Sequence, residues 1–266
     1  MIIDTHCHLD DLRYQDDLDE VLGRAKEAGI ASMIIPGADI ADLKRAIALC
    51  EHYDHLWFAA GVHPYHHAVF DEPTLRDALS HPKCVAVGEC GLDHYRLPED
   101  KEERAHEKRR QKEVFIAQIA LAREFKKPLI VHIRDASADA KEILLEYDAK
   151  EVGGVLHCFN ADEQLLSLAK QGFYFGIGGV LTFKNAKKLV SVLPKIPLDR
   201  LLFETDAPYL TPEPFRGSRN EPAYTALVVA KAAELLDCDP SELAKRSTAN
   251  ALRLFGAIIQ PPSTEE

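Results

Sequence analysis

Histidine and carboxylate side chains recur at the ends of apolar segments along this chain. The first segment, residues 1–5, leads into His6 and His8. Side chains two positions apart on a strand leave the same face, so both imidazoles could reach one metal ion. Later apolar segments end in the same residue types: Glu89, His132, His157 and Asp206. Imidazoles and carboxylates without a thiolate suit Zn²⁺, Mn²⁺ or Mg²⁺, and their recurrence predicts one metal site.

Glu89 gives a separate indication of bound cations. It follows the apolar residues 85–88, and no basic residue lies close to it in the sequence. An unpaired carboxylate is costly to bury. Cations in the site would therefore explain its position better than a loop cap would.

The elements that must position these side chains alternate between strands and helices. Apolar segments rich in Val, Ile and Leu predict eight buried strands, at residues 2–6, 32–36, 56–63, 84–89, 128–132, 154–157, 173–177 and 201–205. Helical patterns follow at residues 16–28, 40–52, 74–80, 103–125, 138–147, 163–170, 185–193, 223–236 and 241–255. Eight such units predict an α/β fold, a single-domain TIM-type (β/α)8 barrel over residues 1–258 with a polar tail at 259–266.

An open doubly wound sheet is the alternative architecture. The chain has no glycine-rich phosphate motif, and polar residues end successive strands at equivalent positions. Both observations favour the closed barrel. The loops after its strands build the active site in such barrels, and the proposed ligands all fall there.

Length, charge and hydropathy limit the class of protein. A chain of 266 residues with 46% hydrophobic content can form one large barrel. We expect no membrane association and a cytoplasmic protein, because no signal-like start or apolar run of about 20 residues is present. We also expect a monomer, because nothing in the sequence demands an oligomer. The net charge of −11 argues against a basic nucleic-acid surface. Two divalent ions would nevertheless make one cleft locally positive.

The six cysteines form no CxxC pair, which predicts reduced thiols. Three of them, Cys7, Cys90 and Cys158, lie next to proposed ligands. Alternation along a strand would turn their side chains to the opposite face, where we expect them to be buried.

Several short motifs occur in order along nearly the whole chain. They are Thr5-His6-Cys7-His8-Leu9-Asp10, Gly61-Val62-His63-Pro64, Gly88-Glu89-Cys90-Gly91-Leu92-Asp93, Val131-His132-Ile133-Arg134-Asp135-Ala136, Leu156-His157-Cys158-Phe159, Glu204-Thr205-Asp206-Ala207-Pro208-Tyr209-Leu210 and Arg216-Gly217-Ser218-Arg219-Asn220-Glu221-Pro222. With these motifs the chain resembles the TatD family of metal-dependent deoxyribonucleases, a branch of the amidohydrolase-like barrels. Two positions depart from the family pattern, because Asn160-Ala161 stands where a Ser-Gly pair is common and His94 where tyrosine is common. Neither position is a proposed ligand, so both concern substrate fit.

The resemblance implies a cofactor of two divalent metal ions, Mg, Mn or Zn. It implies one ion on His6, His8 and Asp206, a second on His132 and His157, and Glu89 as the bridge. Asp206 would also orient the attacking water and accept its proton, a role suited to a carboxylate.

Other polar residues are candidates for substrate contact. His63, on the mouth face of the third predicted strand, could bond a phosphate oxygen, protonate the leaving group or only support the site. Arg134 shares the strand face of His132, and Arg216 and Arg219 follow the eighth strand. Arginine matches phosphate geometry, although many surface arginines are only solvated.

Two acidic residues are expected to support the ligand histidines from within the barrel. By strand parity, Glu204 and Asp4 are predicted to point into the interior.

The function implied by the resemblance is two-metal hydrolysis of phosphodiester bonds, by a 3′–5′ exodeoxyribonuclease that trims single-stranded DNA ends. A metal-dependent hydrolase of another bond is the first alternative, for example an aminoacyl-tRNA ester or a small-molecule amide, because chemistry follows the site rather than the barrel. A non-catalytic metal-binding protein is the second alternative, and the complete ligand set argues against it.

Overall fold

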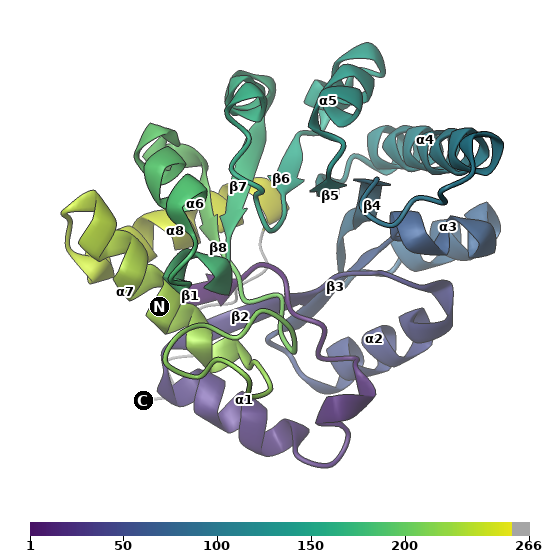
Figure 1. Ribbon diagram of the computed structural model, residues 1–266. Coiled ribbons are helices and arrows are strands. Elements are labelled where there is room, and N and C mark those ends of the chain that lie inside the picture. Colours follow the sequence, from purple (N-terminus) through teal and green to yellow (C-terminus); the bar gives the residue numbers. More distant parts are fainter. Residues whose placement is uncertain (257–266) are drawn as a thin grey trace.

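Eight parallel strands surround a common axis in the computed structural model, which describes residues 1–256 (Figure 1). The predicted tail at 259–266 and the domain boundary at 258 lie outside the described residues. The strands are β1 (Ile2–Asp4), β2 (Ile30–Ile35), β3 (Leu56–Ala60), β4 (Cys84–Asp93), β5 (Leu129–Arg134), β6 (Gly154–Leu156), β7 (Phe173–Ile177) and β8 (Leu201–Phe203). They form one sheet in the order β1 to β8.

Backbone hydrogen bonds join the segments after β1 and β8. The Thr5 N–H donates to the carbonyl of Phe203 over 3.2 Å, and the Asp206 N–H donates to that of His6 over 2.9 Å. The His8 N–H donates to the carbonyl of Ala207 over 2.7 Å. The predicted closed (β/α)8 barrel is therefore confirmed, and the open sheet is excluded.

Helices surround the strands (Figure 1). They are α1 (Leu18–Glu27), α2 (Ile40–His52), α3 (Glu72–Leu79), α4 (Lys101–Phe125), α5 (Ser137–Glu146), α6 (Lys187–Val192), α7 (Thr225–Leu236) and α8 (Pro240–Phe255). Asp39, Asp100 and Asp239 each accept a backbone N–H at the start of a helix, which satisfies donors that have no intrahelical partner. The α-helix predicted at 163–170 is instead a 3₁₀ helix, Glu163–Gln171. Among the helices of residues 1–256, none combines the length and the apolar character that a bilayer crossing requires.

Apolar side chains that alternate along the strands fill the barrel below the site. Ile34, Ile130, Val155 and Leu202 belong to one buried cluster, together with Phe255 at the end of α8. Their strand neighbours on the opposite face pack in a separate cluster with the helices. Since side chains two residues apart share a face, the interior face continues from Ile130 to His132, from Val155 to His157 and from Leu202 to Glu204.

Candidate metal centre

Glu89 lies at a bulge inside β4. The register of β4 against β5 shifts between Val87 and Cys90, and such a shift re-aims the side chains beside it. Gly88 has a φ of +153°, and a Cβ there would lie 2.6 Å from the carbonyl oxygen of Ile130, so only glycine fits. The Glu89 side chain enters the barrel and the residue is 3% exposed. The prediction that the strand ends at Glu89 was wrong, because β4 continues to Asp93.

One oxygen of Glu89 faces the N-terminal histidines. Glu89 Oε2 lies 3.3 Å from His6 Nε2 and 3.9 Å from His8 Nε2. Asp206 Oδ1 lies 3.6 Å from His6 Nε2 and 3.5 Å from His8 Nε2. Four side chains from three distant parts of the chain thus form one group of potential ligands.

The other oxygen of Glu89 faces two more imidazoles. Glu89 Oε1 lies 2.9 Å from His132 Nδ1 and 3.3 Å from His157 Nε2. Five of the six side chains that the sequence analysis proposed as ligands are therefore gathered around the carboxylate of the sixth, Glu89.

These groups fit divalent cations. Metal–ligand bonds of about 2.0–2.2 Å in tetrahedral geometry place neighbouring ligand atoms about 3.4 Å apart. The nitrogen–oxygen distances given above bracket that separation. Within the described residues, both ring nitrogens of His6 are buried and lack a hydrogen-bond partner, and a buried polar atom without a partner is costly. A cation on His6 Nε2 would remove part of that cost.

The carboxylates are in the ionised state that metal binding requires. Burial alone would raise the pKa of Glu89, but the imidazoles of His157 and His6 hold that pKa well below its usual range. Burial likewise opposes ionisation of Asp206, yet a hydrogen bond from His8 and the charges of His157 and His6 lower its pKa. Both groups are therefore carboxylates near neutral pH.

Two further carboxylates contact His132 and His157 on their other ring nitrogens. The Oδ2 of Asp93 lies 3.0 Å from His132 Nε2, and the Oε1 of Glu204 lies 3.2 Å from His157 Nδ1. With a cation bound, each carboxylate would accept the proton of the ring nitrogen that it faces, so the opposite nitrogen would present its lone pair to the cation. The predicted support by Glu204 is confirmed. Asp93 was missed, because only a strand that extends beyond Glu89 places it on the same face.

Asp4 does not support the site from the interior, and that prediction was wrong. Its carboxylate accepts hydrogen bonds from the hydroxyls of Thr205 (2.6 Å) and Thr225 (3.2 Å). Thr225 belongs to α7, so Asp4 points to the helix layer. The carboxylate also accepts the backbone N–H of His6 over 3.2 Å, which fixes the chain where it leaves β1.

His63 presents a proton to the centre. Its Nδ1 accepts the backbone N–H of Tyr65 over 3.1 Å, so the proton is on Nε2, which lies 3.7 Å from Glu89 Oε1. Burial lowers the pKa of His63 to about 3, so the ring is neutral near pH 7. His63 is therefore placed as a hydrogen-bond donor rather than as a metal ligand.

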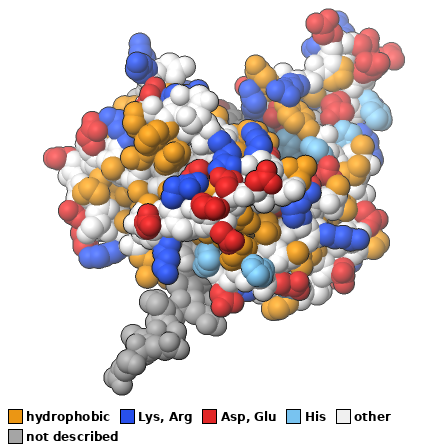
Figure 2. Space-filling model, turned by 90° about the horizontal axis from the view of Figure 1, so that it is seen from below, with side chains coloured by type: hydrophobic (Ala, Val, Ile, Leu, Met, Phe, Trp, Pro, Cys, Tyr) orange, Lys and Arg blue, Asp and Glu red, His pale blue; other side chains and the backbone are white. Residues whose placement is uncertain are grey.

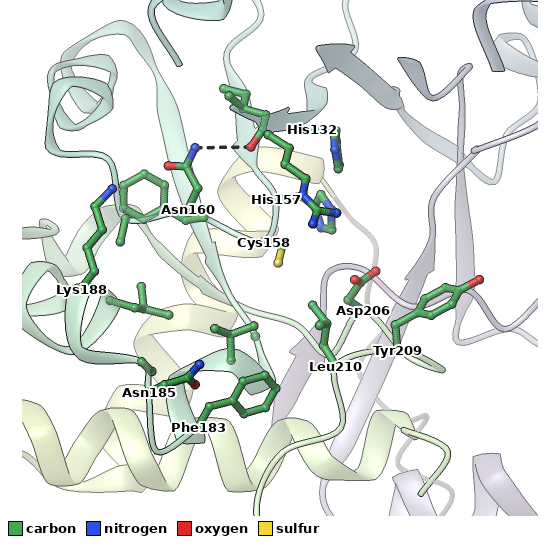
Figure 3. Close-up of a pocket in the computed structure, with 18 residues that line it drawn as sticks. His132, His157, Cys158, Asn160, Phe183, Asn185, Lys188, Asp206, Tyr209 and Leu210 are labelled. Carbon is green, nitrogen blue, oxygen red and sulfur yellow. Dashed lines mark hydrogen bonds between the residues drawn. The ribbon is translucent and has the colours of Figure 1, made fainter. Parts of the chain in front are cut away.

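A cavity of about 620 Å³ opens beside the centre. His132, His157 and Asp206 lie at one side of it (Figure 3). Arg134 also lines it. Cys158 faces this cavity instead of being buried on the opposite face as predicted, while Cys7 and Cys90 are buried. None of the cysteines in residues 1–256 is in a disulfide.

The remaining sequence candidates have other neighbours. Arg219 forms ion pairs with Asp17 and Glu221, so its guanidinium is already engaged. The guanidinium of Arg216 lies 3.9 Å from the ring centroid of Phe183, and its side chain does not line the cavity. The two departures from the family pattern also separate, because Asn160 lines the cavity whereas His94 lies in a different hollow beside α4.

We expect the Asp93→Asn substitution to weaken metal binding at His132 about 10- to 100-fold. Asp93 accepts the backbone N–H of Tyr95 on one oxygen and bonds His132 on the other. An asparagine that still accepts the Tyr95 N–H turns its amide N–H₂ toward His132 Nε2. The ring proton of His132 then moves to Nδ1, so the Nδ1 lone pair is no longer available to a cation. Titration of the metal-free protein with Mn²⁺ or Zn²⁺ measures the change.

The matched control is Asp135→Asn, at an exposed residue just after β5. Its metal affinity should equal that of the unsubstituted protein. Equal affinity of the Asp93 variant would show that this carboxylate does not set the tautomer of His132.

Comparisons with known proteins show which family the chain resembles in sequence and in fold. The family model described as TatD related DNase matches residues 3–256. The uncharacterized metal-dependent hydrolase YabD of Bacillus subtilis is 43% identical over 96% of this chain and 99% of its own length. The 3′–5′ ssDNA/RNA exonuclease TatD of Erwinia tasmaniensis is 37% identical over 96% and 99% of the two chains. The crystal structure of YJJV, a TatD homologue from Escherichia coli, matches with a TM-score of 0.88, 32% identity and coverage of 96% and 98%.

Proposed function

Because the chain belongs to the TatD-related DNase family of metal-dependent hydrolases, we propose that it is a nuclease that removes nucleotides from the 3′ ends of single-stranded DNA with two divalent metal ions. The observation that carries the proposal is the position of Glu89, whose two oxygens face two separate groups of ligands. Two-metal sites of this kind serve in-line displacement at phosphorus. Relatives such as the Erwinia tasmaniensis exonuclease support the choice of substrate.

The ligand groups divide between the two ions. His6, His8, Asp206 and one oxygen of Glu89 would hold one ion, and His132, His157 and the other oxygen would hold the second. Mg²⁺, Mn²⁺ and Zn²⁺ all suit this set of nitrogen and oxygen donors. Such ions supply positive charge at the phosphate oxygens and lower the pKa of water.

The protein side chains complete the chemistry. Asp206 is a carboxylate near neutral pH, and 17% of its side chain is exposed, so water reaches it and it can accept the proton of the attacking water. The Nε2–H of His63 points to the same centre and would donate a hydrogen bond to a phosphate oxygen or to the leaving oxygen.

The negative net charge does not prevent DNA binding. Lys and Arg side chains are interspersed with Asp and Glu side chains over the face shown in Figure 2, so the charge of −11 does not make that face uniformly negative. The monomeric state and the cytoplasmic location remain predictions from the sequence.

The test is cleavage of 5′-labelled single-stranded DNA by protein loaded with Mg²⁺, Mn²⁺ or Zn²⁺. We expect products that shorten from the 3′ end and slower cleavage of blunt duplex DNA. Parallel assays with an amide and an aminoacyl ester address the alternative function. Intact DNA together with hydrolysis of either of those substrates would replace the nuclease proposal with the alternative.

A further inference from the structure

The two ends of the 620 Å³ cavity differ in chemistry. Its inner end is formed by His132, His157 and Asp206 of the metal centre. Two cationic side chains also line the cavity, Lys188 of α6 and Arg134, the last residue of β5, and both border a second, outer hollow as well. Figure 3 shows Lys188 across the cavity from Asp206. A ligand that spans the cavity would thus meet cations at both ends once the centre holds its ions.

The charged groups of Arg134 and Lys188 form no ion pair. Within residues 1–256, no carboxylate lies within 4.0 Å of either group, whereas such pairs hold other arginines, for example Arg76 and Arg219. The guanidinium of Arg134 is instead stacked on Tyr95, 3.7 Å from the ring centroid. On a chain with a net charge of −11, two unpaired cations at one opening indicate an anionic ligand.

The wall between the two ends is largely apolar. Val180, Phe183 and Leu189 line it, and the Asn185 amide joins them. Within the described residues, that amide makes no hydrogen bond to a protein group. An aromatic ring and aliphatic side chains beside a donor and acceptor suit a nucleobase, which has apolar faces and a polar edge.

A second hollow of about 340 Å³ adjoins the cavity, because Arg134, Asn160 and Lys188 line both. Asp135 and Asp162 also line this second hollow. Asn160 is held in place, because its amide donates to the carbonyl of Ile133 and to the hydroxyl of Ser137. The two cations therefore lie where the cavity and the second hollow adjoin.

We propose that this cavity is a nucleotide subsite, in which the nucleotide on the 5′ side of the scissile bond places its base against Phe183 and its 5′-phosphate between Arg134 and Lys188. The inference rests on the proposed function, since the metal centre must hold the scissile phosphate. The volume is in the range of small-molecule pockets and limits the subsite to the nucleotide beside the scissile bond. Recognition of the substrate then depends on the phosphate next to the scissile one on its 5′ side, and on a base that is not paired with a second strand.

The experiment compares two thymidine dinucleotides, TpT and the 5′-phosphorylated pTpT. They share one scissile bond and differ only in the phosphate assigned to Arg134 and Lys188. In the unsubstituted protein, the KM of pTpT should be about 10-fold lower than that of TpT, as expected for charge-assisted hydrogen bonds. Lys188→Ala and Arg134→Ala should each bring the ratio of the two KM values close to one.

Lys187→Ala is the matched control, because this exposed lysine is adjacent on α6 but lines neither hollow. It should keep the 10-fold ratio. With longer single strands, log(kcat/KM) falls as log[salt] rises. The slope of this dependence should become less negative by about 0.7 in the Lys188 variant and stay unchanged in the Lys187 variant.

The small diester bis(p-nitrophenyl) phosphate separates the two proposals. If the unsubstituted protein hydrolyses it but has equal KM values for TpT and pTpT, the subsite is overturned and the nuclease proposal stands. If the metal-loaded protein hydrolyses none of the three diesters and also leaves labelled single-stranded DNA intact, the proposed function fails and the subsite fails with it. If it cleaves the DNA but neither TpT nor pTpT, the subsite alone is overturned.

Discussion

Replacing Glu89 by glutamine should lower phosphodiester turnover by about 10³-fold or more. Each Glu89 oxygen faces its own group of ligands, so the neutral amide weakens both ion sites at once. Ion stabilisation of a phosphoryl transition state is worth several kcal/mol, and about 1.4 kcal/mol corresponds to a factor of ten in rate. Steady-state turnover of labelled single-stranded DNA measures the loss.

Metal content distinguishes this effect from a loss of folding. The glutamine variant should bind fewer than two ions per chain by elemental analysis, while its circular dichroism spectrum stays unchanged. Glu146→Gln, at an exposed position on α5, should retain both the turnover and the ions. A Glu89 variant with near-normal turnover would exclude the bridging role.

Periodicity along the strands correctly placed His132 and His157 on the interior face of the barrel. His132 and His157 follow interior residues of β5 and β6 by two positions, and alternation places them above the apolar layer. The same reasoning placed His6 and His8 on one face of the first predicted strand. That strand is shorter than predicted, because β1 ends at Asp4. Hydrogen bonds to the segment after β8 hold both residues instead, and these depend on barrel closure.

Residues whose roles depend on distant partners were not accessible to sequence reasoning. Asp93 could have been found from its spacing of four residues from Glu89, but only if the strand had been extended through a bulge. The partner of Arg219 is Asp17, about 200 positions away, so no local pattern identifies it. Lys188 and Phe183 follow β7 in a segment without a metal-ligand motif, and only folding places them beside the centre.

Asp206→Asn should lower turnover about 10²- to 10⁴-fold, the range for loss of a positioned proton acceptor, and it should leave the ions bound. The asparagine keeps an oxygen that can ligate a cation near His6 and His8, but the amide cannot accept the proton of the attacking water. Because the pKa of Asp206 is held below its ordinary value, the unsubstituted protein has its proton acceptor available from about pH 5 upward.

The pH profile tests this role independently of metal loading. Without the carboxylate, the proton must pass to solvent hydroxide, so the rate of the asparagine variant should rise about tenfold for each pH unit where the unsubstituted protein is nearly flat. Two bound ions together with a steep profile would assign proton transfer to Asp206. Loss of one ion together with an unchanged pH profile of the rate would show that Asp206 only binds metal and does not accept the proton. The Glu89 and Asp206 variants would then differ only in the number of ions that they lose.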